Sequence, residues 1–185
     1  MGAAAVNAKT FCNTLMSFSV VFSNALAQGT QIVTGHLVGA GREDAAGKRV
    51  MKTLCTSLPV AVGIAVLNCL LCPITLKIFD ATPDVVSMVQ KLLMVGIVME
   101  IGRTTNLVVI GSMKAAGDVL FPVLVGLACM WGVGIGVGYT CGVALSLGVA
   151  GVFMGTCADE CVRGIFMLIR WKKGSWKGKS VVRKA

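Results

Sequence analysis

Five long apolar runs constrain the fold of this chain more than any other feature of its sequence. Each run is long enough to cross the hydrocarbon core of a bilayer, which takes about 20 apolar residues. Backbone N–H and C=O groups in lipid must be paired within the spanning structure, and no run alternates polar and apolar residues as the strands of a membrane barrel do. The sequence therefore predicts an all-α integral membrane protein with five spans, at residues 10–38, 54–79, 85–113, 119–145 and 147–169.

Composition supports this class. Hydrophobic residues make up 56% of the 185 residues, and the mean hydropathy is +0.84. Charged residues make up 14% of the chain, whereas a soluble domain carries about 25%. We expect residues 1–170 to form one transmembrane lobe and residues 171–185 to form a basic cytoplasmic tail.

Basic residues gather in the segments between alternate spans. Four occur in the Gly41–Lys52 segment, Lys114 follows the third span, and the tail after residue 170 carries Lys and Arg without any acid. Five spans place all these segments on one side, which the positive-inside rule identifies as the cytoplasm. We expect a multi-pass protein of the plasma (inner) membrane with a cytoplasmic C-terminus. The same rule accounts for the net charge of +9, and no nucleic-acid-binding motif accompanies that charge, so no nucleic-acid partner is expected.

Two spans carry charges near their centres. Glu100 and Arg103 lie in the third span, and Asp159, Glu160 and Arg163 lie in the fifth. Each such charge costs roughly 2.5–3.5 kcal/mol at a bilayer centre, so these residues are expected to face a partner or a water-filled path. Their spacing allows each arginine to pair with acids on its own helix. They are candidates for ion coupling or substrate binding, and a static set of salt bridges is the alternative.

Polar side chains form a stripe along the first span. At about 100° per residue the stripe occupies an arc of roughly 60°. Unpartnered amides are costly in lipid, so this face should look inward. It either forms hydrogen bonds between helices or lines a substrate cavity, and we favour the cavity. The cavity-lining candidates are Asn13, Ser17, Asn24, Gln28 and Gln31.

Small residues and cysteines have structural interpretations. The Gly-xxx-Gly spacings in the fourth span, and Gly151-xxx-Gly155 in the fifth, predict close helix packing. The eight cysteines lie in or near spans, where they act as small apolar residues. Cys69 and Cys72 have CxxC spacing but no second pair and no nearby histidine, so no metal site is expected. No HExxH or GxSxG motif is present, so an intramembrane enzyme is the weakest hypothesis.

Several short motifs, in their order and spacing, resemble the C-terminal half of the multidrug and toxic compound extrusion (MATE) family. The resemblance covers nearly the whole chain and implies that the five spans are helices eight to twelve of a twelve-helix, two-lobe antiporter. It also implies exchange of sodium or protons for organic cations or drugs, with no other cofactor, and it adds Asn106 to the candidate site. The motifs are Gln31–Gly41, Glu100–Asn106, Ala116–Asp118, Phe121–Pro122, Met130–Gly132 and Ala158–Gly164.

The chain departs from the family pattern in ways that affect these expectations. The N-terminal lobe and the seventh helix have no counterpart here, so the resemblance implies an incomplete fragment that needs a missing N-terminal lobe or a second copy. Family members carry an essential acid in the first helix, which has no counterpart here. Certain sodium-coupled members carry an acid in helix ten near the position of Arg103, and Glu100 is the candidate to take the place of that acid. The alternative is a small self-associating membrane protein with a structural or accessory role.

Overall fold

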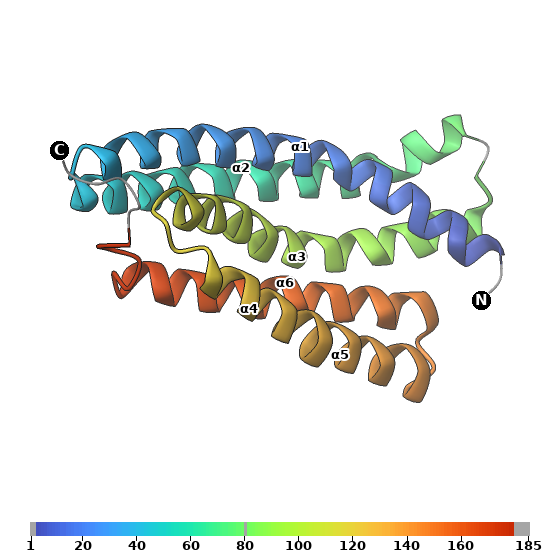
Figure 1. Cartoon of the computed structure of the whole chain (residues 1–185). Helices are drawn as coiled ribbons and strands as arrows, with labels where there is room; N and C mark the ends of the chain where they lie inside the picture. Colours follow the sequence, from blue (N-terminus) through green and yellow to red (C-terminus); the bar gives the residue numbers. More distant parts are fainter. Residues whose placement is uncertain (1–2, 80, 180–185) are drawn as a thin grey trace.

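The computed structural model describes residues 3–79 and 81–179, and within these ranges the chain is helical apart from short turns (Figure 1). This confirms the predicted all-α fold. The elements are α1 (Ala3–Gly39), α2 (Glu43–Ile78), α3 (Pro83–Ala115), α4 (Leu120–Cys129), the π-helical turn η1 (Met130–Ile135), α5 (Gly136–Tyr139), the π-helical turn η2 (Thr140–Ala144) and α6 (Gly148–Lys172).

Four helical stretches are long and apolar enough to cross a membrane: Val6–Gly39, Glu43–Ile78, Pro83–Ala115 and Leu120–Ala144. The last of these is the continuous run from α4 to η2. The fifth helix, α6, is not among these stretches, because it carries Asp159, Glu160 and Arg163 at its centre. That α6 also crosses the bilayer stays a prediction.

The predicted loop over Gly41–Lys52 is wrong in its extent. The chain turns over residues 40–42, and α2 begins at Glu43, eleven residues before the predicted span. Charged residues lower the hydropathy of these first turns without interrupting the helix, and Glu43 and Asp44 favour a helix N-terminus. With 36 residues, α2 is about 54 Å long, so it extends beyond a hydrocarbon core of about 30 Å.

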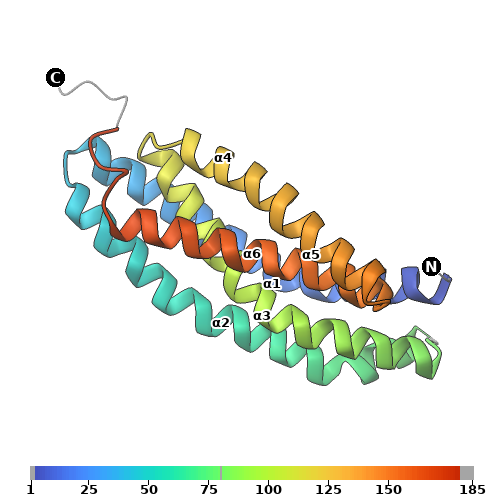
Figure 2. The same cartoon turned by 90° about the horizontal axis from the view of Figure 1, so that it is seen from below.

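The helices lie side by side along one long axis (Figures 1 and 2). The central helix α3 packs against α1, α2 and α6, and α6 lies between α3 and the α4–η2 run. The chain crosses the molecule five times, so α1 begins at one end and α6 finishes at the other. We call the end that holds the 40–42 turn and the end of α6 the basic end.

Two apolar clusters form the core, with a polar layer between them. One cluster, including Cys12, Leu92 and Phe153, lies toward the N-terminal end of α1. The other, including Val50, Val109 and Trp171, lies toward the basic end. Between them along α1 and α3 are the buried polar residues Ser19, Ser23, Glu100, Thr104 and Asn106. The intramembrane charges therefore lie midway along the bundle.

Glycines set the spacing between α6 and its two neighbours. A Cβ on Gly155 would lie 2.5 Å from Gly138 Cα, and one on Gly151 would lie 2.4 Å from Gly142 N. On the other face of α6, a Cβ on Gly102 of α3 would lie 2.7 Å from the Glu160 carbonyl oxygen. The predicted close packing between the fourth and fifth spans is confirmed, and the α3–α6 contact at Gly102 is an addition.

The tail folds back on the basic end. The indole rings of Trp171 and Trp176 stack 4.1 Å apart, and Trp176 is fully buried. Lys177 Nζ donates to Asp44 Oδ1 at 2.6 Å, and Lys179 Nζ donates to Asp118 Oδ1 at 2.7 Å. Residues 173–179, which we call the tail clasp, therefore tie α2 and the α3–α4 turn to α6. That these residues belong to a cytoplasmic tail stays a prediction. Residues 180–185 of the expected tail lie outside the described residues.

The tail clasp should be sensitive to acid through Asp118. Burial raises the pKa of this carboxyl, but hydrogen bonds from Arg170 and Lys179 outweigh burial and hold the pKa below its usual value. A carboxyl with a lowered folded-state pKa stabilises the fold above its unfolded pKa, about 3.9, and this contribution disappears as pH falls through the folded value.

We therefore expect the clasp to stay docked between pH 5 and 8 and to be released below about pH 4. The combined fluorescence of Trp171 and Trp176, measured with Trp131 replaced by phenylalanine, should shift to the red on release. Asp118→Asn should already show the red-shifted emission of the released clasp at neutral pH, or its emission should change much less as pH falls. A transition centred between pH 5 and 8 would contradict this account.

Candidate functional site

The six charged and polar candidates lie together where α3 contacts α6. The close approach at Gly102 places Glu100, Arg103 and Asn106 beside residues 159–163. Asn106 Nδ2 donates to Glu160 Oε2 at 2.7 Å and to the Glu160 carbonyl oxygen at 2.9 Å. We call Glu100, Arg103, Asn106, Asp159, Glu160 and Arg163 the charged layer.

The predicted ion pairs are confirmed. Arg103 Nη1 lies 3.3 Å from Glu100 Oε2, and the Glu100 side chain is fully buried. Arg163 Nη2 contacts Asp159 Oδ2 and lies 3.8 Å from Glu160 Oε1. Three carboxylates thus share two guanidinium groups in this layer, which favours binding of an additional cation or proton.

Several buried atoms of the charged layer have unused hydrogen-bonding capacity. Glu100 Oε1, Asn106 Oδ1, Asp159 Oδ1 and Arg163 Nε have no hydrogen-bond partner among the described residues. An unsatisfied buried polar atom costs about 1–3 kcal/mol, and more if it is charged. Such a layer is poised to bind an ion, a proton or a polar ligand.

A hollow of about 270 Å³ opens from the charged layer toward α1. Arg103, Asn106, Glu160 and Arg163 line one side of it, with Lys114 nearer the basic end. The other side comes from three residues of the predicted polar stripe, Asn24, Gln28 and Gln31. We call this space the central hollow.

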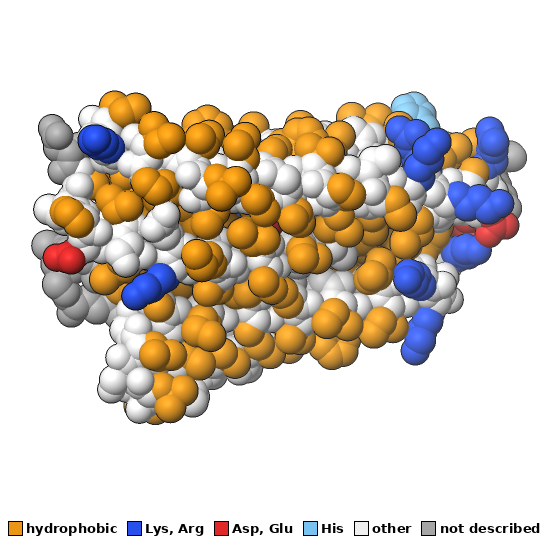
Figure 3. Space-filling view, turned by 180° about the vertical axis from the view of Figure 1, so that it is seen from behind, with side chains coloured by type: hydrophobic (Ala, Val, Ile, Leu, Met, Phe, Trp, Pro, Cys, Tyr) orange, Lys and Arg blue, Asp and Glu red, His pale blue; other side chains and the backbone are white. Residues whose placement is uncertain are grey.

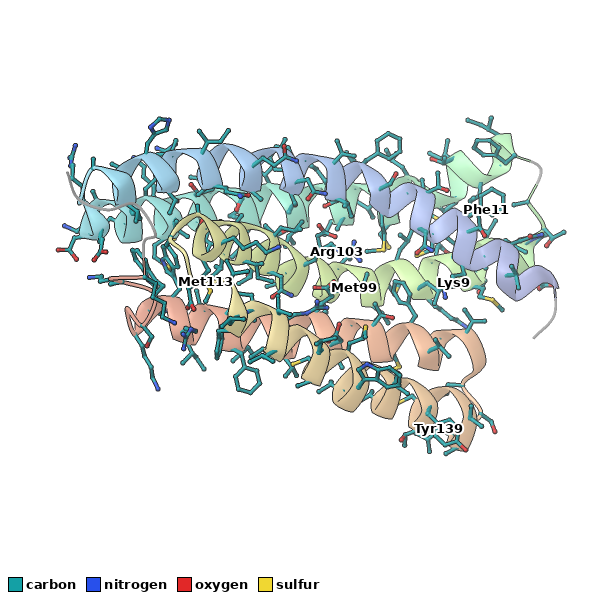
Figure 4. The ribbon with its side chains drawn as sticks, viewed as in Figure 1. Lys9, Phe11, Met99, Arg103, Met113 and Tyr139 are labelled. Carbon is teal, nitrogen blue, oxygen red and sulfur yellow. The ribbon has the colours of Figure 1, made fainter. Side chains whose placement is uncertain are left out.

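The central hollow continues toward the basic end. A second, more open hollow of about 820 Å³ shares Gln28 and Gln31 with it and is also lined by Gly35, His36 and Ala115. The two hollows therefore adjoin each other between the middle of the bundle and the basic end. In Figure 4, Arg103 and Met99 lie midway along the bundle, and Met113 lies nearer the basic end.

The structure separates the predicted stripe into two parts. Asn24, Gln28 and Gln31 border the central hollow, whereas Asn13 and Ser17 are exposed farther along α1. Ser17 Oγ donates to the Thr14 carbonyl oxygen at 2.6 Å. Within this lobe α1 packs a different face against α2 and α3. That Asn13 and Ser17 line a substrate cavity stays a prediction.

Hydroxyl side chains form the inward face of α1, and the sequence analysis missed them. Ser23 Oγ lies 3.0 Å from Thr104 Oγ1, and Thr30 Oγ1 donates to Thr53 Oγ1 at 3.2 Å. Ser19 and Thr34 are buried on the same face. The four-residue spacings from Ser19 to Ser23 and from Thr30 to Thr34 predict a shared helix face, because residues four apart lie on the same side of a helix.

The cysteines take mainly the packing role predicted for them. Cys12, Cys72 and Cys157 belong to an apolar core cluster, whereas Cys55 is exposed. Thiols in such surroundings fill space and contribute little to the charged layer.

Comparison with known proteins agrees with the motifs. The MatE family model matches residues 1–140, about three quarters of the chain. The chain belongs to the MATE family. It is similar to an uncharacterized transporter, YisQ, from Bacillus subtilis (strain 168), with 36% identity over 181 residues. It is also similar to a probable multidrug resistance protein, NorM, from Pasteurella multocida (strain Pm70), with 26% identity over 161 residues.

The coverage is unequal in these comparisons. The alignment with YisQ takes in 98% of this chain and 40% of YisQ, and the alignment with NorM takes in 85% of this chain and 35% of NorM. This MATE family chain therefore spans about two fifths of the length of these relatives.

Proposed function

We propose that the chain forms the C-terminal lobe of a cation-coupled antiporter that exports organic cations or drugs. The observation that carries the proposal is the charged layer, in which three carboxylates share two arginines and Glu160 lines the central hollow. Membership of the MATE family supports a transporter rather than an enzyme.

The charge balance of the layer supplies a mechanism for exchange. A sodium ion or proton bound at Glu100, Asp159 or Glu160 neutralises the charge that would otherwise attract a cationic substrate in the central hollow. Both ligands cannot use the same carboxylate, because two positive charges a few ångströms apart repel strongly in a medium of low dielectric constant. Binding of one ligand therefore promotes release of the other, which is the requirement for antiport.

The exposed polar residues of α1 support a missing partner surface. Asn13, Ser17 and Gln28 are exposed although they lie in a helix that is long and apolar enough to cross a membrane. Amides and hydroxyls exposed to lipid are unfavourable, so we propose that a second lobe covers this face. Alternating access then arises from rocking of the two lobes around a shared site near the bilayer midplane.

A chimeric transporter tests the function. The chain should replace the matching segment of YisQ, and efflux of a fluorescent organic cation should be followed in cells under a sodium or proton gradient. We expect gradient-driven efflux from the chimera and none from the chain alone. Efflux from the chain alone would overturn the need for a second lobe and favour a self-associating protein.

The orientation of the chain can be tested separately. Lys and Arg side chains gather at the basic end (Figure 3), so we propose that this end faces the cytoplasm and that the inner membrane holds the protein. In a background without native cysteines, a membrane-impermeant maleimide should label Asp84→Cys in intact cells. It should label Arg42→Cys or Lys173→Cys only after the cells are opened. The reverse pattern would refute this orientation.

A further inference from the structure

A hollow of about 480 Å³ lies at the basic end, between the first turns of α2 and the tail clasp. It belongs neither to the charged layer nor to the central hollow. Its lining includes four lysines, Lys48, Lys172, Lys173 and Lys177, and three apolar residues, Met51, Trp171 and Trp176.

The charges around this hollow are unbalanced. None of Lys48, Lys172 and Lys173 has an acidic partner within salt-bridge distance in the part of the chain that the structure describes. The acid that lines the hollow, Asp44, accepts a hydrogen bond from Lys177 at 2.6 Å. Three unpaired ammonium groups around one concave space favour a ligand with a compact negative charge.

The rest of the lining favours a ligand that also has an apolar part. The stacked rings of Trp171 and Trp176 form a rigid base, fixed by a 3.0 Å hydrogen bond from Trp176 Nε1 to the Trp171 carbonyl oxygen. Met51 continues this apolar surface along α2, where it packs against the core cluster near the basic end. In Figure 3 the basic side chains lie directly beyond the hydrophobic side chains that cover the length of the bundle. This is the level at which lipid headgroups meet a membrane protein.

We propose that this hollow binds the phosphate headgroup of an anionic phospholipid. Lys48, Lys172 and Lys173 surround the phosphate, and Met51 and the Trp171–Trp176 pair contact the glycerol and the first acyl carbons. Clusters of lysine next to a membrane-spanning helix favour anionic lipid. Because Lys48 lies on α2 and Lys173 lies in the tail clasp, the bound lipid also holds the tail clasp against α2.

Tryptophan quenching tests the site on the full chain. With Trp131 replaced by phenylalanine, Trp171 and Trp176 report on the hollow, and the protein is placed in mixed micelles of neutral lipid. Phosphatidylglycerol with brominated acyl chains should quench their fluorescence in a saturable way. It should do so at a mole fraction about tenfold lower than brominated phosphatidylcholine, which carries the same acyl chains without net charge.

Charge-matched variants identify the residues. Lys48→Gln, Lys172→Gln and Lys173→Gln together should raise the half-saturating fraction of phosphatidylglycerol about tenfold. The control variant removes the same charge at the opposite end, through Lys9→Gln, Lys77→Gln and Lys91→Gln together. It should leave the half-saturating fraction of phosphatidylglycerol unchanged. If the triple variant loses its helical circular dichroism, Lys172→Gln alone should still weaken binding several-fold.

The outcomes separate the possible ligands. Equal quenching by the two lipids, or equal effects of the two triple variants, would overturn the proposal. Inorganic phosphate at millimolar concentration should compete weakly. If it displaces phosphatidylglycerol completely at low concentration, the site binds free phosphate and the lipid assignment is wrong. None of these measurements depends on transport, so they stand apart from the proposed efflux function.

Discussion

Replacing Gly155 with alanine should lower the free energy of unfolding by about 3 kcal/mol, the upper part of the usual range for overpacking. The new Cβ would lie 2.5 Å from Gly138 Cα and 2.6 Å from both Gly138 N and the Gly134 carbonyl oxygen. All three are backbone atoms, so a side-chain rotation cannot relieve the clash and the two helices must separate. Thermal unfolding in detergent, followed by circular dichroism, measures the loss.

Gly132 provides the matched control. It lies in the same glycine-rich run, but a Cβ there meets no atom within 4 Å. Gly132→Ala should therefore change stability by less than about 0.5 kcal/mol, as surface substitutions usually do. Equal melting temperatures for Gly155→Ala and Gly132→Ala would mean that the α4–η2 run does not pack on α6 as described.

The sequence predicted most of the helices because apolar length and lipid leave the chain little choice. It also predicted the ion pairs, since Glu100–Arg103 and Asp159–Arg163 are three and four residues apart on single helices. The contact between the Gly134–Gly142 face and Gly151–Gly155 followed from the same kind of spacing. Each of these features depends on residues that are near one another in the chain.

Features that depend on distant residues were not predictable in the same way. The approach of Gly102 to Glu160 joins isolated positions on two helices, with no local repeat to mark it. The Trp171–Trp176 pair is close in sequence, but its burial requires α2, whose Gly47 lies against the Trp176 ring. The stripe on α1 was predicted from residue polarity, whereas packing against α2 and α3 depends on side-chain size. The face with small hydroxyl side chains therefore packs inward, and Asn24, Gln28 and Gln31 line the central hollow.

Neutralising Glu100 should have the largest effect on the charged layer. Glu100→Gln leaves the Arg103 guanidinium, whose side chain is 18% exposed, without its carboxylate. Removing one partner of a buried pair costs about 3–5 kcal/mol, and the partial exposure of Arg103 places the expected loss toward the lower value. We expect a lower melting temperature and, in the chimera with YisQ, loss of gradient-driven efflux.

A double variant separates the stabilising role of this pair from its proposed role in ion coupling. Glu100→Gln with Arg103→Gln removes both charges, and joint removal of a buried pair is often nearly neutral for stability. Stability should therefore recover toward that of the unmodified protein. If Glu100 binds the coupling ion, efflux stays lost in the double variant despite the recovered stability, because no carboxylate remains at that position. If efflux recovers together with stability, the pair only holds the helix in place. Ion coupling must then depend on Asp159 and Glu160. Asp159→Asn and Glu160→Gln would test this in the same chimera.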